Sequence, residues 1–368
     1  MFPGAALNLD ELERLARERL STMAYDYYAS GARDERTLRE NIAAWERIPL
    51  YHRVLVDVST RDLSTTVLGS PVSMPVLVAP TAFHRLACEE GELATARAAA
   101  RSRTVMILSS LSNTGVEDVR AAAAGAHLWF QLYVYRDRAA TAALVARAEA
   151  AGASAIVLTV DSPLFGQRER DVRNRFHLPE GLRVENMTAA GHAHVPERGG
   201  ESGLAAYIAE KLDPSLTWKD VAWLRSVTRL PVVVKGIVRS DDAVRAVEHG
   251  ASAVVVSNHG GRQLDGSPAT AAVLGPVADA VQGRIEVYVD GGVRRGTDVL
   301  RALSLGARAV LLGRPILWGL AVAGEEGAHG VLEAMRAELD HGMALAGCAR
   351  LSDASRDLVS ICVTTNSR

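Results

Sequence analysis

The chain has 368 residues, of which 48% are hydrophobic, 23% charged and 5% aromatic, and its formal net charge is −2. This length and apolar content support a sizeable buried core and exclude a wholly disordered chain. The balanced charge excludes nucleic acid and an anionic membrane as main partners. Cys88, Cys348 and Cys362 are too scattered for a disulfide framework or a zinc knuckle, so we expect no metal site and a reducing compartment.

The ends of the chain and its most apolar stretch bear on location. Residues 1–9 lack the basic-then-apolar pattern of a secretory signal, and the last five residues do not match a peroxisomal address. The stretch 309–324 is interrupted by Gly313, Arg314 and Pro315, which makes it too broken to span a bilayer. Together these features predict a cytoplasmic protein without membrane contact.

The first 70 residues predict a helical segment. Asn8 and Glu11 form a capping-box pattern ahead of leucines that recur on one side of a helix. A second helical piece carries Tyr25, Tyr27 and Tyr28. We therefore expect helices over 1–70, before the first strand.

Eight short aliphatic runs follow, apolar almost throughout, as strands covered on both faces must be. They are Pro75–Ala79, Val105–Leu108, His127–Leu132, Ala155–Val160, Pro231–Val234, Ala253–Val256, Ile285–Val289 and Ala309–Leu312. Ala-rich helical stretches separate most of them, including Glu90–Arg101, Val116–Ala124, Arg138–Ala151, Ser240–His249 and Gly296–Leu305. The alternation predicts an α/β fold, a (β/α)8 TIM barrel, rather than an open doubly wound sheet.

The barrel should occupy residues 71–320 of a single domain that spans 1–368, with a helical segment over 321–368. An open sheet would need a glycine-rich turn after its first strand, where this chain has Pro80-Thr81-Ala82. One connection is abnormally long, because 76 residues separate Thr159 from Lys235. Its polar part, about 165–217, predicts an insertion that forms a mobile lid over the barrel mouth, with a disordered surface excursion as the alternative.

Active sites of such barrels lie at the C-terminal ends of the strands. Each predicted strand changes from aliphatic to polar at that end. In chain order, the residues at these ends are Pro80, Thr81 and Ala82; Ser109; Gln131 and Tyr133; Thr159 and Asp161; Lys235; Ser257, His259 and Arg262; Asp290 to Arg294; Gly313 and Arg314. A purely structural barrel has no reason to gather such residues on one rim, so they predict a functional site.

The ends of the seventh and eighth strands predict a phosphate site. Gly291 and Gly292 let backbone N–H groups approach an anion closely. Arg294 and Arg314 can add bidentate hydrogen bonds. Barrels of this type commonly hold a phosphate here, whereas plain turns are the alternative reading of the glycines.

The segment from Ser257 to Arg262 is the densest motif. His259 can take up a proton near neutral pH, and Arg262 can hold a carboxylate in its fork, although a structural histidine is the alternative. Because Asp290 ends a neighbouring strand, we expect it to hydrogen-bond His259 and orient it. Lys235 closes an apolar strand and so needs an anionic neighbour, either a reduced flavin or a carboxylate. His84 lacks such partners and is read as structural.

Ordered segments of the chain resemble the FMN-dependent 2-hydroxy acid oxidases and dehydrogenases, the glycolate oxidase and lactate oxidase group. The matching segments are Tyr25–Gly31, Ala79–Ala82, Gln131–Tyr133, Leu158–Asp161, Ser257–Asp265 and Asp290–Arg294. The resemblance runs from about Tyr25 to about Cys348. It implies oxidation of an L-2-hydroxy acid to the 2-oxo acid with FMN as cofactor, in a homotetramer.

The resemblance also implies roles for individual residues. FMN would be bound by Pro80, Thr81, Ala82, Ser109, Gln131, Thr159, Lys235, Ser257, Asp290, Gly291, Gly292, Val293, Arg294, Gly313 and Arg314. Substrate would be bound by Tyr27, Leu111, Tyr133, Arg168, His259 and Arg262. His259 would be the catalytic base, oriented by Asp290. Tyr133 would stabilise charge at the hydroxyl, and Lys235 would stabilise negative charge on the flavin.

Two positions bear on substrate and electron acceptor. Glycolate-specific members of the group carry Trp where this chain has Leu111, which predicts a pocket for larger acids, such as lactate, medium-chain or aryl-substituted ones, with Phe165 as another wall. Ala82 resembles the oxidases, so we expect O2 as acceptor and H2O2 as product. A dehydrogenase with another acceptor, a different FMN barrel enzyme such as a diphosphate isomerase, and a catalytically silent FMN-binding protein are the alternatives.

Overall fold

The computed structural model describes residues 6–197 and 202–360. Part of the predicted insertion, residues 198–201, and Cys362 therefore lie outside the described residues. The chain opens with α1 (Leu9–Arg19), α2 (Thr22–Ala29) and α3 (Arg36–Glu46). The predicted capping box is present, since Asn8 accepts a hydrogen bond from the Glu11 backbone N–H (2.9 Å) and donates one to its carboxylate (3.0 Å).

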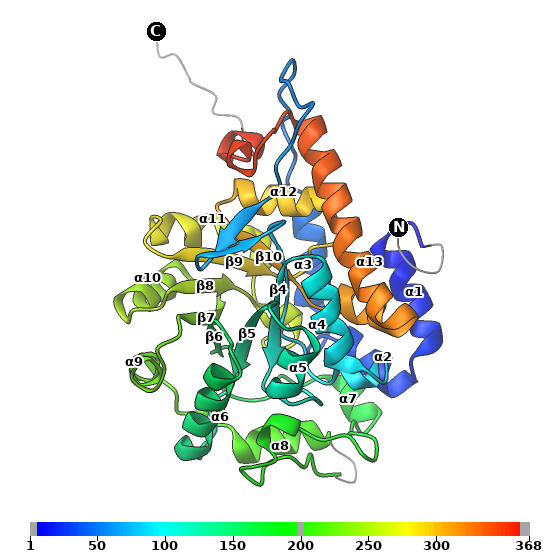
Figure 1. Cartoon of the computed structure of the whole chain (residues 1–368), viewed down its shortest axis with the longest axis vertical. Coiled ribbons are helices and arrows are strands. Elements are labelled where there is room, and N and C mark those ends of the chain that lie inside the picture. The colour runs from blue at the N-terminus through cyan, green and yellow to red at the C-terminus, as the bar shows by residue number, and fades with distance from the viewer. Residues whose placement is uncertain (1–5, 198–201, 361–368) are drawn as a thin grey trace.

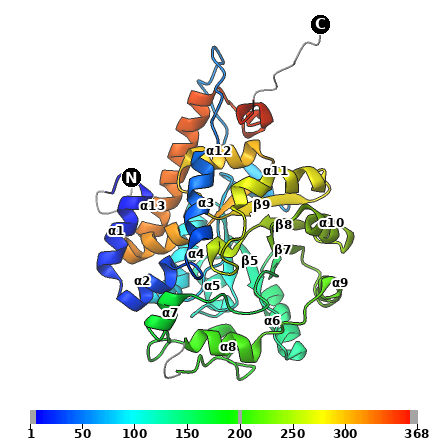
Figure 2. The same cartoon turned by 180° about the vertical axis from the view of Figure 1, so that it is seen from behind.

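The predicted barrel is confirmed as eight parallel strands that close on themselves in the order β10-β3-β4-β5-β6-β7-β8-β9. These strands are β3 (Val76–Val78), β4 (Val105–Ser109), β5 (His127–Leu132), β6 (Ile156–Thr159), β7 (Val232–Ile237), β8 (Ala253–Val256), β9 (Glu286–Asp290) and β10 (Ala309–Leu312). All eight lie within two or three residues of the aliphatic runs that predict them. Figures 1 and 2 show the strands at the centre and the helices around them.

The strands are aliphatic throughout because both of their faces are buried. On β3, Leu77 faces the barrel interior, where it packs in one cluster with Trp129 and Tyr288. Its neighbours Val76 and Val78 belong to the second cluster, which fills the space between the strands and the helices. Two buried layers, rather than one, remove the polar alternation that a solvent-facing sheet would show.

Helices cover the outside of the barrel, as the right-handed βα repeat requires. They are α4 (Gly91–Arg101), α5 (Val116–Ala122), α6 (Arg138–Ala150), α9 (Trp218–Val227), α10 (Ser240–Glu248), α11 (Thr270–Val281), α12 (Gly296–Ser304) and α13 (Arg314–Ala346). The last of these bends at Ala323 and Gly324, whose φ and ψ angles are not helical. No helix among the described residues is long and apolar enough to cross a membrane.

The segment before the barrel is not helical throughout. After α3 the chain is extended, and it then forms a small antiparallel hairpin of β1 (Thr65–Val67) and β2 (Ser70–Val72). Val67 and Val72 pack against the cluster inside the barrel. The hairpin thus helps to close the N-terminal end of the barrel, a role that the helical prediction for 1–70 missed.

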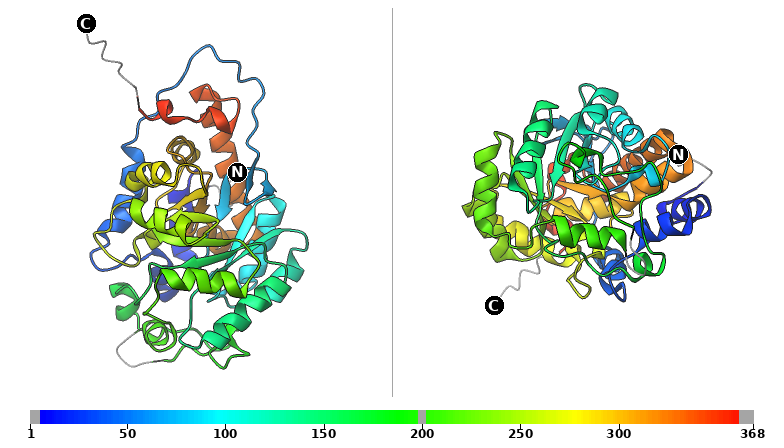
Figure 3. Two further views of the ribbon diagram at one scale, coloured as in Figure 1. Left: turned by 90° about the vertical axis from the view of Figure 1, so that its left-hand side faces the viewer. Right: turned by 90° about the horizontal axis from the view of Figure 1, so that it is seen from below.

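The insertion between β6 and β7 contains α7 (Glu169–Arg173), a short 3-10 turn (Glu185–Met187) and α8 (Gly203–Lys211). It lies at the end of the molecule opposite the C-terminal turns, as Figure 3 shows in green and red. Phe176, Met187 and Tyr207 of the insertion are buried in the main hydrophobic cluster. The described part of the insertion is therefore packed structure that covers the barrel mouth.

Candidate active site

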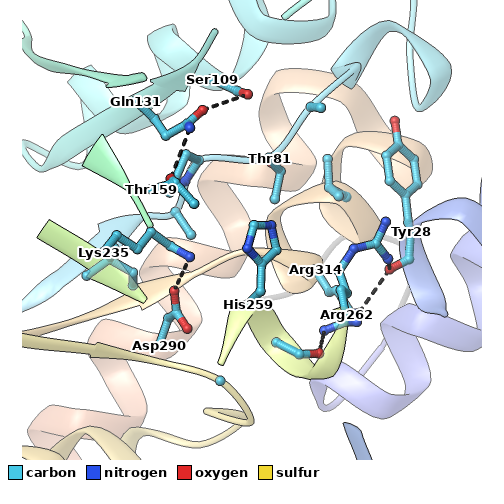
Figure 4. A pocket seen from close by; sticks show the side chains of 18 of the residues that line it. Tyr28, Thr81, Ser109, Gln131, Thr159, Lys235, His259, Arg262, Asp290 and Arg314 are labelled. Atoms are coloured by element: carbon cyan, nitrogen blue, oxygen red, sulfur yellow. Dashed lines mark hydrogen bonds and ion pairs between the residues drawn. The ribbon is translucent and has the colours of Figure 1, made fainter. Parts of the chain in front are cut away.

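The C-terminal ends of the barrel strands surround one cavity. Every predicted site residue except Asp161 and Ser257 lines it, and the insertion contributes Phe165, Arg168, Leu204 and Ile208. Ser257 lies just beneath the surface of the cavity, where it accepts hydrogen bonds from Lys235 Nζ (3.0 Å) and from the His259 backbone N–H (3.1 Å). Figure 4 shows that the labelled side chains reach this space from several different strands.

His259 is held by Asp161 at the mouth of the cavity. Its Nδ1 lies 2.8 Å from Asp161 Oδ1, which fixes Nδ1 as the donor and leaves the Nε2 lone pair free. That Nε2 lies 3.5 Å from the Tyr133 hydroxyl. The chain segment that carries His259 is held in place by Asn258. The side-chain amides of Asn258 and Asn41 of α3 each donate one hydrogen bond to the other.

The charges around His259 set its proton affinity. Burial lowers the pKa of His259, and Lys235 lowers it further, whereas Asp161 raises it. Burial would raise the pKa of Asp161, but His259 and Lys235 hold it below its usual value. The result is a neutral imidazole beside an ionised carboxylate, which is the arrangement of a general base.

The prediction that Asp290 orients His259 is wrong. Asp290 instead pairs with Lys235, with 3.2 Å between Asp290 Oδ2 and Lys235 Nζ. The reason is the level of each side chain along the barrel axis. Asp290 is the last residue of β9 and Lys235 lies within β7, and inward side chains of alternate strands share one layer. His259 lies three residues beyond the end of β8, where it meets Asp161, two residues beyond the end of β6.

The Lys235–Asp290 pair continues into a ring of polar side chains across the barrel. Burial would lower the pKa of Lys235, but Asp290 and Asp161 raise it above its ordinary value, so the side chain is a fixed cation. On the opposite side Ser109 donates to Gln131 (3.2 Å), and Gln131 donates to Thr159 (3.0 Å). This ring offers amide, hydroxyl and ammonium groups to the edge of a planar polar ligand.

The other end of the cavity is cationic and made partly of backbone. Gly291 and Gly292 have φ angles of +97° and +81°, and a Cβ on Gly292 would lie 1.9 Å from the Asn41 carbonyl oxygen. Among the described residues, Arg314 donates only to the carbonyl oxygens of Tyr28, Ser30 and Gly260. Desolvation lowers the pKa of Arg314, and its cationic neighbours lower it further.

FMN, which the sequence resemblance implies, fits these residues. Neither Arg294 nor Arg314 has a carboxylate in salt-bridge distance among the described residues, so the pair lacks a counter-charge that a phosphate would supply. Asp290 Oδ1 is buried and accepts no hydrogen bond from any described residue, so it can still accept one from a ligand. The glycine turn supplies the close backbone approach that phosphate binding needs.

A second set of cations, Arg262 and Arg168, lines the same cavity as His259. Arg262 donates to the Ser30 carbonyl oxygen (2.9 Å), and its Cζ lies 5.1 Å from the centre of the Tyr27 ring. Desolvation and Arg168 lower the pKa of Arg262 to about 10, so it stays protonated at neutral pH. Burial raises the pKa of both Tyr27 and Tyr133, which keeps their hydroxyl groups protonated as donors.

Apolar side chains complete the wall beside these cations. Leu111 is buried, and Phe165 packs under the Arg168 guanidinium at 4.0 Å from ring centre to Cζ. Leu204 and Ile208 come from α8 of the insertion and line the same cavity. Sequence reasoning missed these two residues because an amphipathic helix carries no signal for the surface on which it packs. The orienting role of Asp161 was also missed, although its place after a strand end was visible.

Comparisons with known proteins agree with this geometry. Residues 16–361 match the family described as FMN-dependent dehydrogenase. L-lactate oxidase of Nostoc sp. is 55% identical over 352 residues, which are 94% of this chain and 96% of that protein. 2-Hydroxyacid oxidase 1 of Homo sapiens is 51% identical, and glycolate oxidase of Spinacia oleracea is 50% identical, each over 353 residues, with at least 95% of both chains covered.

Among solved structures, mandelate oxidase with (S)-4-hydroxymandelic acid superposes with a TM-score of 0.92 at 44% identity, covering 95% of this chain and 98% of that one. The likeness thus extends over nearly the whole chain. The chain belongs to the FMN-dependent dehydrogenase family, whose cofactor is FMN.

Proposed function

We propose that this enzyme oxidises an L-2-hydroxy acid to the 2-oxo acid with FMN, which O2 then reoxidises to give H2O2. The observation that carries the proposal is the His259–Asp161 pair beside Arg262 in the same cavity as the cationic cofactor end. A base next to a carboxylate-binding cation suits a substrate that carries both an acidic proton and a carboxylate.

In this reaction the substrate loses two electrons and two protons. FMN, when bound, would accept both electrons and the proton that His259 does not take. His259 Nε2 takes one proton, and the resulting imidazolium is stabilised by Asp161 through Nδ1. Arg262 and Tyr27 hold the carboxylate so that the α-carbon is fixed in place, which is a positioning effect. Tyr133, 3.5 Å from His259 Nε2, donates to the substrate oxygen as charge develops there.

The proposed substrate is larger than glycolate, such as lactate, a medium-chain acid or an aryl-substituted acid. Leu111 supports this, because leucine leaves room that a tryptophan would fill. The other wall residues, Phe165, Leu204 and Ile208, are apolar and suit a hydrocarbon substituent. The relatives named for lactate and mandelate oxidation also favour such substrates.

Oxygen as acceptor is supported by Ala82 and by the relatives, which are named as oxidases. We also propose a homotetramer, on the sequence resemblance, and a reducing compartment such as the cytoplasm, on the scattered cysteines. Light scattering of the purified protein tests the assembly, and fractionation of the source cells tests the location.

One experiment tests the reaction itself. The purified protein should be yellow, and anaerobic mixing with L-lactate or an L-aryl hydroxy acid should bleach the flavin absorbance. The same mixture in air should produce peroxide in a 1:1 ratio to 2-oxo acid. A yellow protein that no 2-hydroxy acid bleaches would refute the proposal and favour the isomerase or the silent FMN-binding protein. Bleaching without peroxide in air would assign a different acceptor.

A further inference from the structure

Asp171 is a buried carboxylate that the proposed reaction does not use. It lies in α7 of the insertion, and the residue is 1% exposed. Neither of its carboxylate oxygens accepts a hydrogen bond from any residue within 6–197 or 202–360. A buried carboxylate without hydrogen bonds is costly, so its place in the structure requires charge partners.

Those partners are two arginines that line the cavity, Arg168 and Arg262. Arg168 is 5% exposed, and its Nη1 lies 3.6 Å from Asp171 Oδ2. Arg262 attracts the same carboxylate from its position near Tyr27. Asp26, by contrast, raises the pKa of Asp171 because its negative charge repels the carboxylate. Burial raises the pKa of Asp171, whereas Arg168 and Arg262 oppose that change.

Arg168 Nε has no acceptor among the described residues, and the guanidinium carbon Cζ lies over the Phe165 ring, 4.0 Å from its centre. Arg168 lines the cavity together with Arg262. With Asp171 ionised, this group of three carries a net charge of +1, which one substrate carboxylate neutralises. A second carboxylate would add an uncompensated negative charge in a poorly solvated site.

We propose that Asp171 is the fixed counter-charge of Arg168 and Arg262, a positioning residue that limits the site to acids with a single carboxylate. The inference rests on the proposed function for the class of substrate, and it narrows that class to monocarboxylic 2-hydroxy acids. Asp171 disfavours diacids whose second carboxylate lies close to the first. It does so through its charge, without steric contact between Asp171 and the diacid.

Oxalate and oxamate form a matched pair of probes, because they have nearly the same size and shape but carry two negative charges and one. The test is calorimetric titration of the FMN-loaded enzyme with each probe at mildly alkaline pH. In Asp171→Asn, removal of the buried charge should raise the affinity for oxalate relative to oxamate by about tenfold or more. Asp171→Leu should give the same shift, and Asp171→Glu should restore the wild-type ratio.

Glu169 provides the control, because it is an exposed carboxylate in the same short helix. Glu169→Gln should change the oxalate-to-oxamate ratio by less than about twofold, since water screens an exposed charge. An unchanged ratio in Asp171→Asn, or an equal change in Glu169→Gln, would overturn the proposal. A purely structural role would weaken both probes equally and leave the ratio unchanged, and that result would also overturn it.

Turnover is measured separately, so the two proposals can fail independently. A shifted ratio in an enzyme that oxidises no 2-hydroxy acid would leave the charge-matching role of Asp171 standing and refute the proposed reaction. Normal turnover of L-lactate with an unshifted ratio would refute the role of Asp171 alone.

Discussion

Asp161→Asn tests whether His259 acts as a general base or is only a structural histidine, because it changes the contact between Asp161 and His259. The substitution keeps the size of the side chain but removes the negative charge 2.8 Å from His259 Nδ1. An asparagine can also turn its amide N–H₂ toward Nδ1, which would move the ring proton to Nε2 and block the atom that must accept the substrate proton. Both effects act on the reaction rather than on the fold.

The size of the effect follows from the geometry. A hydrogen bond to a charged group contributes about 1.5–3 kcal/mol, and the imidazolium formed during turnover also loses a partly buried opposite charge. A combined loss of roughly 3–4 kcal/mol corresponds to about a 10²–10³-fold decrease in kcat/KM. Binding of a substrate-like inhibitor through Arg262 should change far less, because Arg262 has no contact with Asp161 in the described structure.

The pH dependence gives a second, independent readout. The base must be neutral, so kcat/KM rises as the pH increases through the His259 pKa, which burial holds below the ordinary histidine value. Asp161 raises that pKa, and its loss should therefore move the acidic limb to still lower pH. Steady-state kinetics from mildly acidic to mildly alkaline pH measure both changes.

Asp290→Asn is the matched control, since Asp290 pairs with Lys235 instead of His259. It should leave the acidic limb of the profile in place and should instead alter FMN affinity or reduction potential. A loss of less than about threefold in Asp161→Asn would contradict the reasoning. So would an acidic limb that moves in Asp290→Asn and stays fixed in Asp161→Asn.

Three further substitutions test other parts of the site. Leu111→Trp should lower kcat/KM for aryl and medium-chain acids by at least about tenfold relative to glycolate, measured across a chain-length series. Lys235→Met should leave a buried carboxylate without its cation, destabilise the protein by about 3–5 kcal/mol and lower the flavin reduction potential, measured by denaturant unfolding and reductive titration. Gly292→Ala should cost at least about 2 kcal/mol of unfolding free energy, because a Cβ would clash with the Asn41 carbonyl, whereas Gly283→Ala, with similar φ and open space, should cost only about 1 kcal/mol.

The barrel is predictable from sequence because both faces of its strands must be buried. A run such as Ala253–Val256 carries no polar residue, and all four positions are fully buried in the structure. Every connection between these runs except one is also short, which leaves few topologies to consider. The hairpin of β1 and β2 escaped prediction because its strands have three residues each, too few to show a period.

The residues that line the cavity were largely predictable as a set, but their pairing was not. Alternation along a strand predicts which side chains point inward, but it does not predict their level along the barrel axis. Asp161 and Asp290 both follow aliphatic runs, and only the stagger of the closed barrel puts the first beside His259 and the second beside Lys235. The α8 residues that line the cavity were beyond prediction for another reason, since the path of a long insertion depends on tertiary packing alone.

The distribution of carboxylates at this rim indicates which cations are neutralised by the protein itself and which remain free to bind an anionic ligand. Lys235 and His259 each have a partner aspartate within 3.2 Å, and Arg168 has one at a longer distance. Arg262 and Arg314 have no salt bridge to any described residue and donate to neutral carbonyl oxygens. Carbonyl oxygens orient a guanidinium without neutralising it, so the positive charge is left for a bound anion. We therefore propose that the substrate carboxylate binds at Arg262 and the cofactor phosphate at Arg314, two local concentrations of positive charge that the net charge of −2 over the whole chain conceals.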